Sequence, residues 1–299
     1  MKPLLERISQ GEILISDGAM GTFLFAKGLQ AGECPESWCI SHADVVRDIA
    51  QAYVDAGADI VETNSFGGNS FKMKPYKLSD KVREFNRAAA ALAKQAISGK
   101  GYVAASVGPT GQIAKEEHGK VPAAELYESF KEQVMALAEG GADAICVETQ
   151  WSVVEATQAV RAARENTNLP VICTFTFEAK PTGFRTGMGV TPERAAKASL
   201  DAGAHVIGAN CGNGITNMIA ITRQMRAAAP NTPILIHANA GLPVFEDGKT
   251  LFKETPEFMA SHVTDLIAAG ANIIGGCCGT TPAHIAAIAK AARGKSAKA

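Results

Sequence analysis

One phrase occurs four times along the chain, and its last copy reads Ala269-Gly270-Ala271-Asn272-Ile273-Ile274-Gly275. Each copy follows a segment with helical periodicity and leads into a short apolar run. Glycine directly after a helix is a common C-cap, and a short apolar run between turns is typical of a buried parallel strand. The phrase therefore predicts a helix, a glycine turn and a strand, in that order.

The earlier copies begin at Ala56, Gly140 and Ala202, and further apolar runs lie between them. The expected strands are Ile13–Ser16, Ile60–Glu62, Val103–Ser106, Ala144–Val147, Val171–Phe175, Val206–Gly208, Ile234–His237 and Ile273–Gly275. Strands that alternate with helices in this way predict an α/β protein, a single (β/α)8 TIM barrel, with an open doubly wound sheet as the alternative. We expect one domain over residues 1–299, with a core at about 5–292 and a frayed tail at 293–299. Two stretches without periodicity, residues 108–122 and 239–256, are expected to be loops.

The composition argues against several classes of protein. The 299 residues are 46% hydrophobic, which is enough for the core of one barrel. The net charge of −1 gives no basic surplus for binding nucleic acid or an anionic membrane. No apolar run approaches the roughly 18 residues that span a bilayer, and the N-terminus lacks the apolar run of a signal peptide. Seven cysteines without an export signal predict reduced thiols and a cytoplasmic location.

Polar and thiol groups gather where the expected strands end. These residues are Asp17, Gly18, Glu62, Glu148, Cys211, Asn239, Cys277 and Cys278. In a TIM barrel the carboxyl ends of all strands meet on one face, and that face carries the active site. We therefore expect these groups to share one site. The remaining cysteines fall inside strands or in the first loop, where a structural role is expected: Cys34, Cys39, Cys146 and Cys173.

The adjacent Cys277 and Cys278 are either inert core thiols or ligands of a soft metal, because a disulfide between neighbours would be strained. Cys211 supplies a third thiol 66 residues before Cys277, only two strands away and roughly 10 Å along the sheet. Three thiolates leave a tetrahedral zinc with one open position, whereas iron–sulfur clusters usually take four cysteines. The constellation favours a catalytic zinc site.

Three thiolates also indicate the chemistry. They give the zinc a net charge of about −1, which makes it a poor Lewis acid toward a carbonyl group. Such a site can still bind a further thiol and remove its proton near neutral pH, leaving a nucleophilic sulfur. The reaction that suits it is alkyl transfer to a thiol.

Five motifs, in order, resemble those of the homocysteine S-methyltransferase family: Asp17–Thr22, Glu62–Asn69, Gly208–Cys211, Asn239–Pro243 and Gly275–Pro282. The resemblance covers roughly residues 5–292. It is closest to the homocysteine-binding module of cobalamin-dependent methionine synthase. It implies a (β/α)8 barrel that methylates L-homocysteine to methionine.

The resemblance also implies roles for single residues. One zinc ion would lie on the three cysteines of the constellation, with the thiol of homocysteine in the fourth position. Asp17 and Glu148 would hold the amino group, and the backbone around Gly18 would lie near the carboxylate. Asn239 would approach the metal when substrate is absent. No further catalytic residue is implied.

Simpler interpretations stand beside these roles. Asp17 could only shape an Asp-Gly turn, Glu148 could pair with buried donors, and Asn239 could be a hydrogen bonder in a loop. His237 could be a fourth metal ligand, although a packed histidine is favoured. Three stretches on the expected active-site face depart from the family pattern and could reshape the substrate pocket: residues 150–151, 182–189 and 212–214.

The sequence leaves the methyl donor open. Because the chain ends after one barrel, we expect the donor to be a small sulfonium or betaine, or methylcobalamin carried on a separate corrinoid protein. One alternative function is a zinc-dependent methyltransferase that moves a methyl group from a small ether, amine or thioether to a corrinoid protein. Another is a zinc-stabilised binding module without turnover. No nucleic acid or membrane partner is expected.

Overall fold

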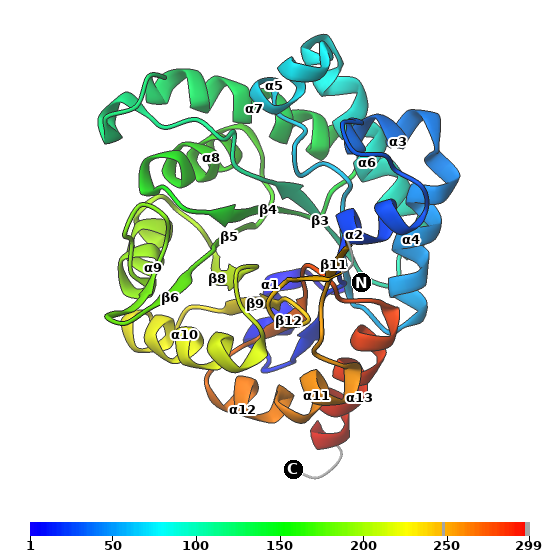
Figure 1. Ribbon diagram of the computed structural model, residues 1–299, viewed down its shortest axis with the longest axis vertical. Coiled ribbons are helices and arrows are strands. Elements are labelled where there is room, and N and C mark those ends of the chain that lie inside the picture. The colour runs from blue at the N-terminus through cyan, green and yellow to red at the C-terminus, as the bar shows by residue number, and fades with distance from the viewer. Residues whose placement is uncertain (247–248, 297–299) are drawn as a thin grey trace.

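The computed structural model describes residues 1–246 and 249–296, and it is a barrel of parallel strands inside a ring of helices (Figure 1). The strand order is β1-β12-β9-β8-β5-β4-β3-β2, and a parallel bridge between Ser16 and Ile60 joins the two end strands. This closure confirms the predicted (β/α)8 barrel and excludes the open doubly wound sheet.

The barrel strands are β1 (Leu14–Ile15), β2 (Ile60–Glu62), β3 (Tyr102–Val107), β4 (Ala144–Gln150), β5 (Val171–Phe175), β8 (Val206–Asn210), β9 (Ile234–Ala238) and β12 (Ile273–Gly276). Each overlaps its predicted range. The α-helices are α1 (Leu4–Ser9), α2 (Met20–Ala26), α3 (Trp38–Ser41), α4 (Ala43–Asp55), α5 (Ser70–Met73), α6 (Val82–Ile97), α7 (Ala123–Glu139), α8 (Val153–Asn166), α9 (Pro192–Asp201), α10 (Ile215–Ala228), α11 (Pro256–Ser261), α12 (Val263–Ala268) and α13 (Pro282–Ser296). Within the described residues, no helix is both long enough and apolar enough to cross a membrane.

Two apolar layers hold the barrel together. A large cluster of buried side chains lies between the strands and the surrounding helices. A smaller cluster fills the barrel interior, where Leu4 and Ile8 of α1 join inward-facing strand residues such as Leu14 and Ile60. Helix α1 therefore packs onto one end of the barrel interior, and the carboxyl ends of the strands are left for the site.

The fourth residue of the repeated phrase makes hydrogen bonds that join its strand to the preceding one. Asp143, the fourth residue of its copy, donates its backbone N–H to Val103 O (2.8 Å) and accepts the Val103 N–H on its side chain (2.9 Å). Asp59, His205 and Asn272 make the same two bonds to the preceding strand. Four clamps of this kind therefore fix the register at alternate strand pairs.

The turn before each clamp depends on glycine. The glycine of the phrase has a positive φ in every copy: +98° at Gly57, +97° at Gly141, +101° at Gly203 and +111° at Gly270. A side chain disfavours this conformation, so glycine ends the helix at low cost and turns the chain into the strand.

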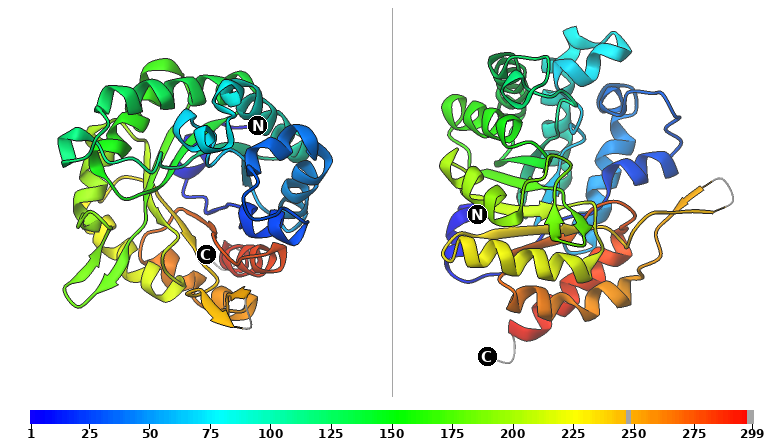
Figure 2. Two further views of the ribbon diagram at one scale, coloured as in Figure 1. Left: turned by 45° about the horizontal axis from the view of Figure 1, so that its top comes forward. Right: turned by 60° about the vertical axis from the view of Figure 1, so that its left-hand side comes forward.

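Several expectations need correction. The segment with helical periodicity before the last copy of the phrase, Pro256 to Ala268, is two helices, α11 and α12, separated at His262. The expected loop at 239–256 contains an antiparallel hairpin, β10 (Val244–Glu246) with β11 (Lys249–Leu251), which projects from the barrel (Figure 2). Each of its strands has three residues without alternation of apolar and polar side chains, so no strand pattern marks them in the sequence.

Two further differences concern segments near the site and the end of the chain. A second hairpin, β6 (Glu178–Lys180) with β7 (Gly183–Arg185), follows β5. Helix α13 continues to Ser296, so the first part of the expected frayed tail is helical, and residues 297–299 lie outside the described residues.

We predict that Asp143→Ala lowers the free energy of unfolding by about 1–3 kcal/mol, because it leaves the buried Val103 N–H without its acceptor. The control is Lys94→Ala, which removes only the half-exposed cation bound to Asp143 (2.7 Å) and should cost about 1 kcal/mol or less. Urea unfolding measures both. Equal losses would show that the ion pair, and not the backbone clamp, stabilises this junction.

Candidate metal and substrate site

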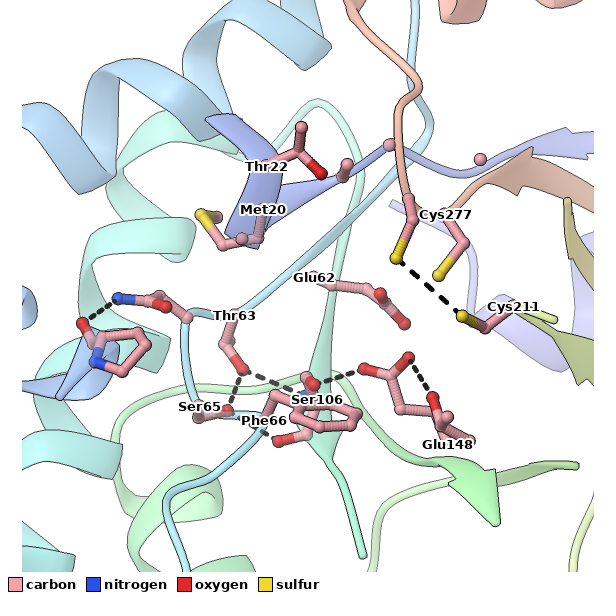
Figure 3. A pocket seen from close by; sticks show the side chains of 18 of the residues that line it. Met20, Thr22, Glu62, Thr63, Ser65, Phe66, Ser106, Glu148, Cys211 and Cys277 are labelled. Atoms are coloured by element: carbon pink, nitrogen blue, oxygen red, sulfur yellow. Dashed lines mark hydrogen bonds between the residues drawn. The ribbon is translucent and has the colours of Figure 1, made fainter. Parts of the chain in front are cut away.

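A cavity of about 270 Å³ opens at the carboxyl ends of the strands (Figure 3). Its wall comes from the segment after β1, from the loop before α3, and from the ends of β2, β3, β4, β8 and β12. The lining residues are Gly18, Ala19, Met20, Gly21, Thr22, Pro35, Glu36, Glu62, Thr63, Asn64, Ser65, Phe66, Ser106, Glu148, Thr149, Cys211, Gly276, Cys277 and Cys278. The site therefore lies on the face where it was expected.

Three sulfurs converge in this cavity. The Sγ atoms of Cys211, Cys277 and Cys278 all lie within 4.8 Å of one another, and those of Cys211 and Cys278 are 3.8 Å apart. Two thiolates on one tetrahedral zinc, each about 2.3 Å from the metal, would be separated by about 3.8 Å. The spacing and the soft sulfur donors fit a zinc ion.

The end of β9 holds the cysteines in place, because β9 lies between β8 and β12. Cys211 donates its backbone N–H to His237 O (3.1 Å), and Cys277 donates to Ala238 O (2.8 Å). Ala240 then donates to Cys278 O (3.0 Å). Cys211 has a φ of +59°, a left-handed conformation that is uncommon for a residue with a side chain. Three backbone positions, at the end of β9 and just after it, therefore hold the backbone of all three cysteines.

The three thiols share negative charge when no cation is bound. Hydrogen bonds from Cys277 and Cys278 lower the pKa of Cys211 to about 3. The same contacts with Cys211 raise the pKa of Cys278 to about 12 and that of Cys277 well above its usual value. The Cys211 thiolate is thus stabilised by the thiols of Cys277 and Cys278. A bound metal cation would take the place of the protons on these two thiols.

Glu148 lines the cavity and is held firmly. Its Oε1 accepts a short hydrogen bond from the Ser106 hydroxyl, and its Oε2 accepts one from Asn210 Nδ2 (3.0 Å). Asn210 Oδ1 also accepts the N–H of Thr149 (2.7 Å), which has a φ of +57°. Because Asn210 directly precedes Cys211, one buried amide links the carboxyl group to the cysteine cluster.

Asp17 lies at the same end of the barrel but does not line the cavity. Only 1% of the residue is exposed, and its Oδ2 accepts the backbone N–H of Glu62 at 2.7 Å. This bond extends the pairing of β1 with β2 where the barrel closes. Its predicted contact with a substrate stays a prediction.

Gly18 lines the cavity where no side chain would fit. A Cβ atom there would lie 2.7 Å from Thr280 Oγ1 and 2.9 Å from the Tyr53 ring. Helix α2 begins two residues later, at Met20, and no side chain caps its first turn. The free N–H groups of a helix start suit a carboxylate.

Asn239 is buried and follows β9 directly. Its backbone N–H donates a hydrogen bond to Asn213 O (3.0 Å). Its side chain contributes to the low pKa of Cys211, and its Oδ1 has no hydrogen-bond partner among the described residues. An orphaned carbonyl oxygen beside a thiol cluster fits a group that can turn toward a metal.

The other residues considered in the sequence analysis lie outside the cysteine cluster. His237 is fully enclosed, burial lowers its pKa to about 4, and it is outside the group of converging sulfurs. The four remaining cysteines are buried free thiols. The stretches that depart from the family pattern, residues 150–151, 182–189 and 212–214, contribute no residue to the cavity wall.

Sequence analysis placed Glu62 among the groups of the expected site without giving it a role, and it did not single out Asn210. Both were visible as polar residues at the ends of predicted strands. Glu62 lines the cavity, and its carboxyl group points toward the space between the cysteines and Glu148 (Figure 3). The position of Asn210 directly before a candidate ligand was the available signal for its role.

Comparison with protein families shows that the family described as Homocysteine S-methyltransferase matches residues 14–292. Curated relatives include the methionine synthases of Mycobacterium tuberculosis, 32% identical over 309 aligned positions, and of Mycobacterium leprae, 31% identical over 306. Each alignment covers 96% of this chain and 25% of the relative. The chain thus spans about a quarter of the length of the curated relatives it matches.

Among solved structures, the homocysteine methyltransferase MmuM from Escherichia coli, in its metallated form, has a TM-score of 0.80 at 22% identity. That alignment covers 96% of this chain and 99% of MmuM. The apo form of MmuM gives a TM-score of 0.74 at the same identity. At this identity the likeness supports the barrel fold alone.

We predict that the metal-free protein loses stability as the pH rises from about 4 to 7. Burial raises the pKa of Asp17 and of Glu148 to about 7, so the folded state binds more protons than the unfolded state in this window. Between pH 5 and pH 8 the variant Glu148→Gln should lose about 2 kcal/mol less unfolding free energy than the wild type. Urea unfolding at the two pH values measures this, and identical losses would contradict the buried titration.

Proposed function

Because this chain belongs to the homocysteine S-methyltransferase family, we propose that it is a zinc-dependent methyltransferase that methylates the thiol of L-homocysteine to give methionine. The observation that carries the proposal is the convergence of three free thiols in one cavity with a buried carboxyl group. Thiolate ligands suit sulfur alkylation, and a carboxylate suits the ammonium group of an amino acid.

Cys211, Cys277 and Cys278 would hold the zinc ion, and the orphaned Oδ1 of Asn239 would approach it in the absence of substrate. A bound zinc ion would favour the thiolate form of the substrate near neutral pH. The backbone bonds from the end of β9 keep the three sulfurs on one side of the cavity, so the rest of the cavity is free for the substrate.

The remaining groups would orient the amino acid. Glu148, fixed by Ser106 and Asn210, would receive the ammonium group, with Asp17 as a second acidic group nearby. The backbone around Gly18 would face the carboxylate. In the transfer, a lone pair of the substrate sulfur would form the new bond to the methyl carbon. The bond from that carbon to the donor would break, with its electrons leaving on the donor.

The donor is proposed to be a small molecule such as a sulfonium or betaine, or a methyl group on a separate corrinoid protein. The second choice follows from the methionine synthase relatives, which are about four times longer than the matched region. The same cysteines also suit an alternative function. In that alternative, a methyl group moves from a small ether, amine or thioether to a corrinoid protein.

We predict that Cys278→Ser loses most of its bound zinc and all methyl transfer, yet stays folded. A core of this size does not depend on one site. Zinc per chain and urea unfolding are the measurements. Cys39→Ser, at a buried thiol outside the cluster, is the matched control and should keep its zinc. Unfolding of Cys278→Ser would mean that the zinc is structural.

We predict that X-ray absorption at the zinc edge changes when L-homocysteine is added to the zinc-loaded protein. Three sulfur neighbours plus a lighter atom should become four sulfurs. Methionine, which has no thiol, is the control ligand and should leave the spectrum unchanged. Zinc that is bound but unaffected by homocysteine would contradict the proposal and favour the alternative, to be tested with methylated substrates and a corrinoid acceptor.

A further inference from the structure

Glu62 is a cavity-lining carboxyl group that the protein leaves poorly satisfied. It ends β2, and its side chain is 14% exposed. Its Oε1 is enclosed by protein and has no hydrogen-bond partner among the described residues, so a ligand in the cavity would meet the other edge of the carboxyl group. The basic atom recorded near it, His237 Nδ1, is 3.9 Å away, which is too far for a hydrogen bond. Burial raises the pKa of Glu62 well above its usual value, with only the Cys146 thiol opposing the shift.

The other two carboxyl groups in the cavity wall are different. Both oxygens of Glu148 accept hydrogen bonds from side chains, as described above. Glu36 accepts the Gly67 N–H on Oε1 (2.7 Å) and the Cys34 thiol on Oε2 (3.2 Å). A buried carboxylate without donors is costly, since it loses its water and gains no partner. Glu62 has one weak donor, the Cys146 thiol, so of the three it has the most acceptor capacity left for a ligand.

The charges around the cavity define that ligand. The wall contains three carboxyl groups and three thiols, and none of its lining residues is a lysine, arginine or histidine. Glu62 also repels, and is repelled by, the neighbouring Glu148 and Asp17. An ammonium group, which donates hydrogen bonds and carries positive charge, would satisfy Glu62 and offset this repulsion.

The direction of the side chain agrees with this requirement. The carboxyl group of Glu62 points into the space between the cysteines and Glu148 (Figure 3). A short ligand with its thiol at the cysteines and its ammonium group near Glu148 would occupy this space. Glu62, at the end of β2, can therefore contact the ammonium group from one side while Glu148, in β4, contacts it from another.

We propose that Glu62 is a specificity-determining residue that binds the ammonium group of the amino-acid thiol, together with Glu148. The assignment rests on the proposed function. It makes the site selective for thiols that carry an amino group, because a ligand without one leaves the buried carboxyl group unsatisfied. Glu148, already held by Ser106 and Asn210, then serves as the fixed half of the ammonium site.

The test is a comparison of two ligands on two proteins. Homocysteine and 4-mercaptobutanoate share the thiol, the chain length and the carboxylate, and differ in the amino group. Calorimetric titration of the zinc-loaded protein gives both affinities. Glu62→Gln, which keeps the shape and removes the charge, should weaken homocysteine binding about 10- to 100-fold and leave 4-mercaptobutanoate binding unchanged.

Two controls accompany this comparison. Glu36→Gln removes a carboxyl group of the same wall whose oxygens the protein already satisfies, so any change should be equal for the two ligands. Zinc content should stay at the wild-type level in both variants. If Glu62→Gln does not fold, Glu62→Met supplies an apolar side chain of similar length for the same titrations.

The outcomes separate the two proposals. Equal losses for both ligands, or no loss for either, would overturn the assignment of Glu62 and leave the proposed function standing. A wild-type protein that binds zinc but not homocysteine would overturn the proposed function, and the assignment of Glu62 with it. Loss confined to homocysteine supports the ammonium contact.

Discussion

The structure depends on the two-way hydrogen bond at the start of alternate strands. In each copy of the repeated phrase, one polar residue both donates to and accepts from the same residue of the preceding strand. A slip of one residue would break both bonds and would turn the inward-facing side chains outward. The clamps at Asp59 and Asn272 thus fix, from the opposite end of the barrel, the positions at which β2 and β12 deliver Glu62 and the paired cysteines.

At the carboxyl ends of the strands, further hydrogen bonds hold the residues of the site in place. Strand β9 is placed between β8 and β12, and its last residues, with Ala240 just after it, bond to the backbone of all three cysteines. Asn210 then ties the Cys211 end of β8 to Glu148 at the end of β4. The cysteine cluster and Glu148 are therefore joined through the backbone and one buried amide.

The sequence predicted the strands and the cysteine cluster for identifiable reasons. Buried parallel strands are apolar runs, and a positive-φ glycine marks their approach, so local residues carry the information. The thiols at strand ends were recognised because cysteine is scarce and chemically distinct. The relative roles of Asp17 and Glu62 could not be predicted in this way. Both are acidic residues at strand ends, and only the closure of β1 against β2 engages one carboxyl group and leaves the other facing the cavity.

The cysteine cluster and the carboxyl groups of the cavity wall respond to burial and to neighbouring negative charge in the same way. Mutual hydrogen bonds lower the pKa of the Cys211 thiol and raise those of Cys277 and Cys278, and burial raises the pKa of Glu148. A metal cation at the cysteines and an ammonium group at the carboxyl groups would each take over the place of protons. The negative groups are too close together and too buried to be ionised at once without such partners. Under the proposed function, the positive charges that would balance this acidic wall come from the ligands, since none of its lining residues is a lysine, arginine or histidine.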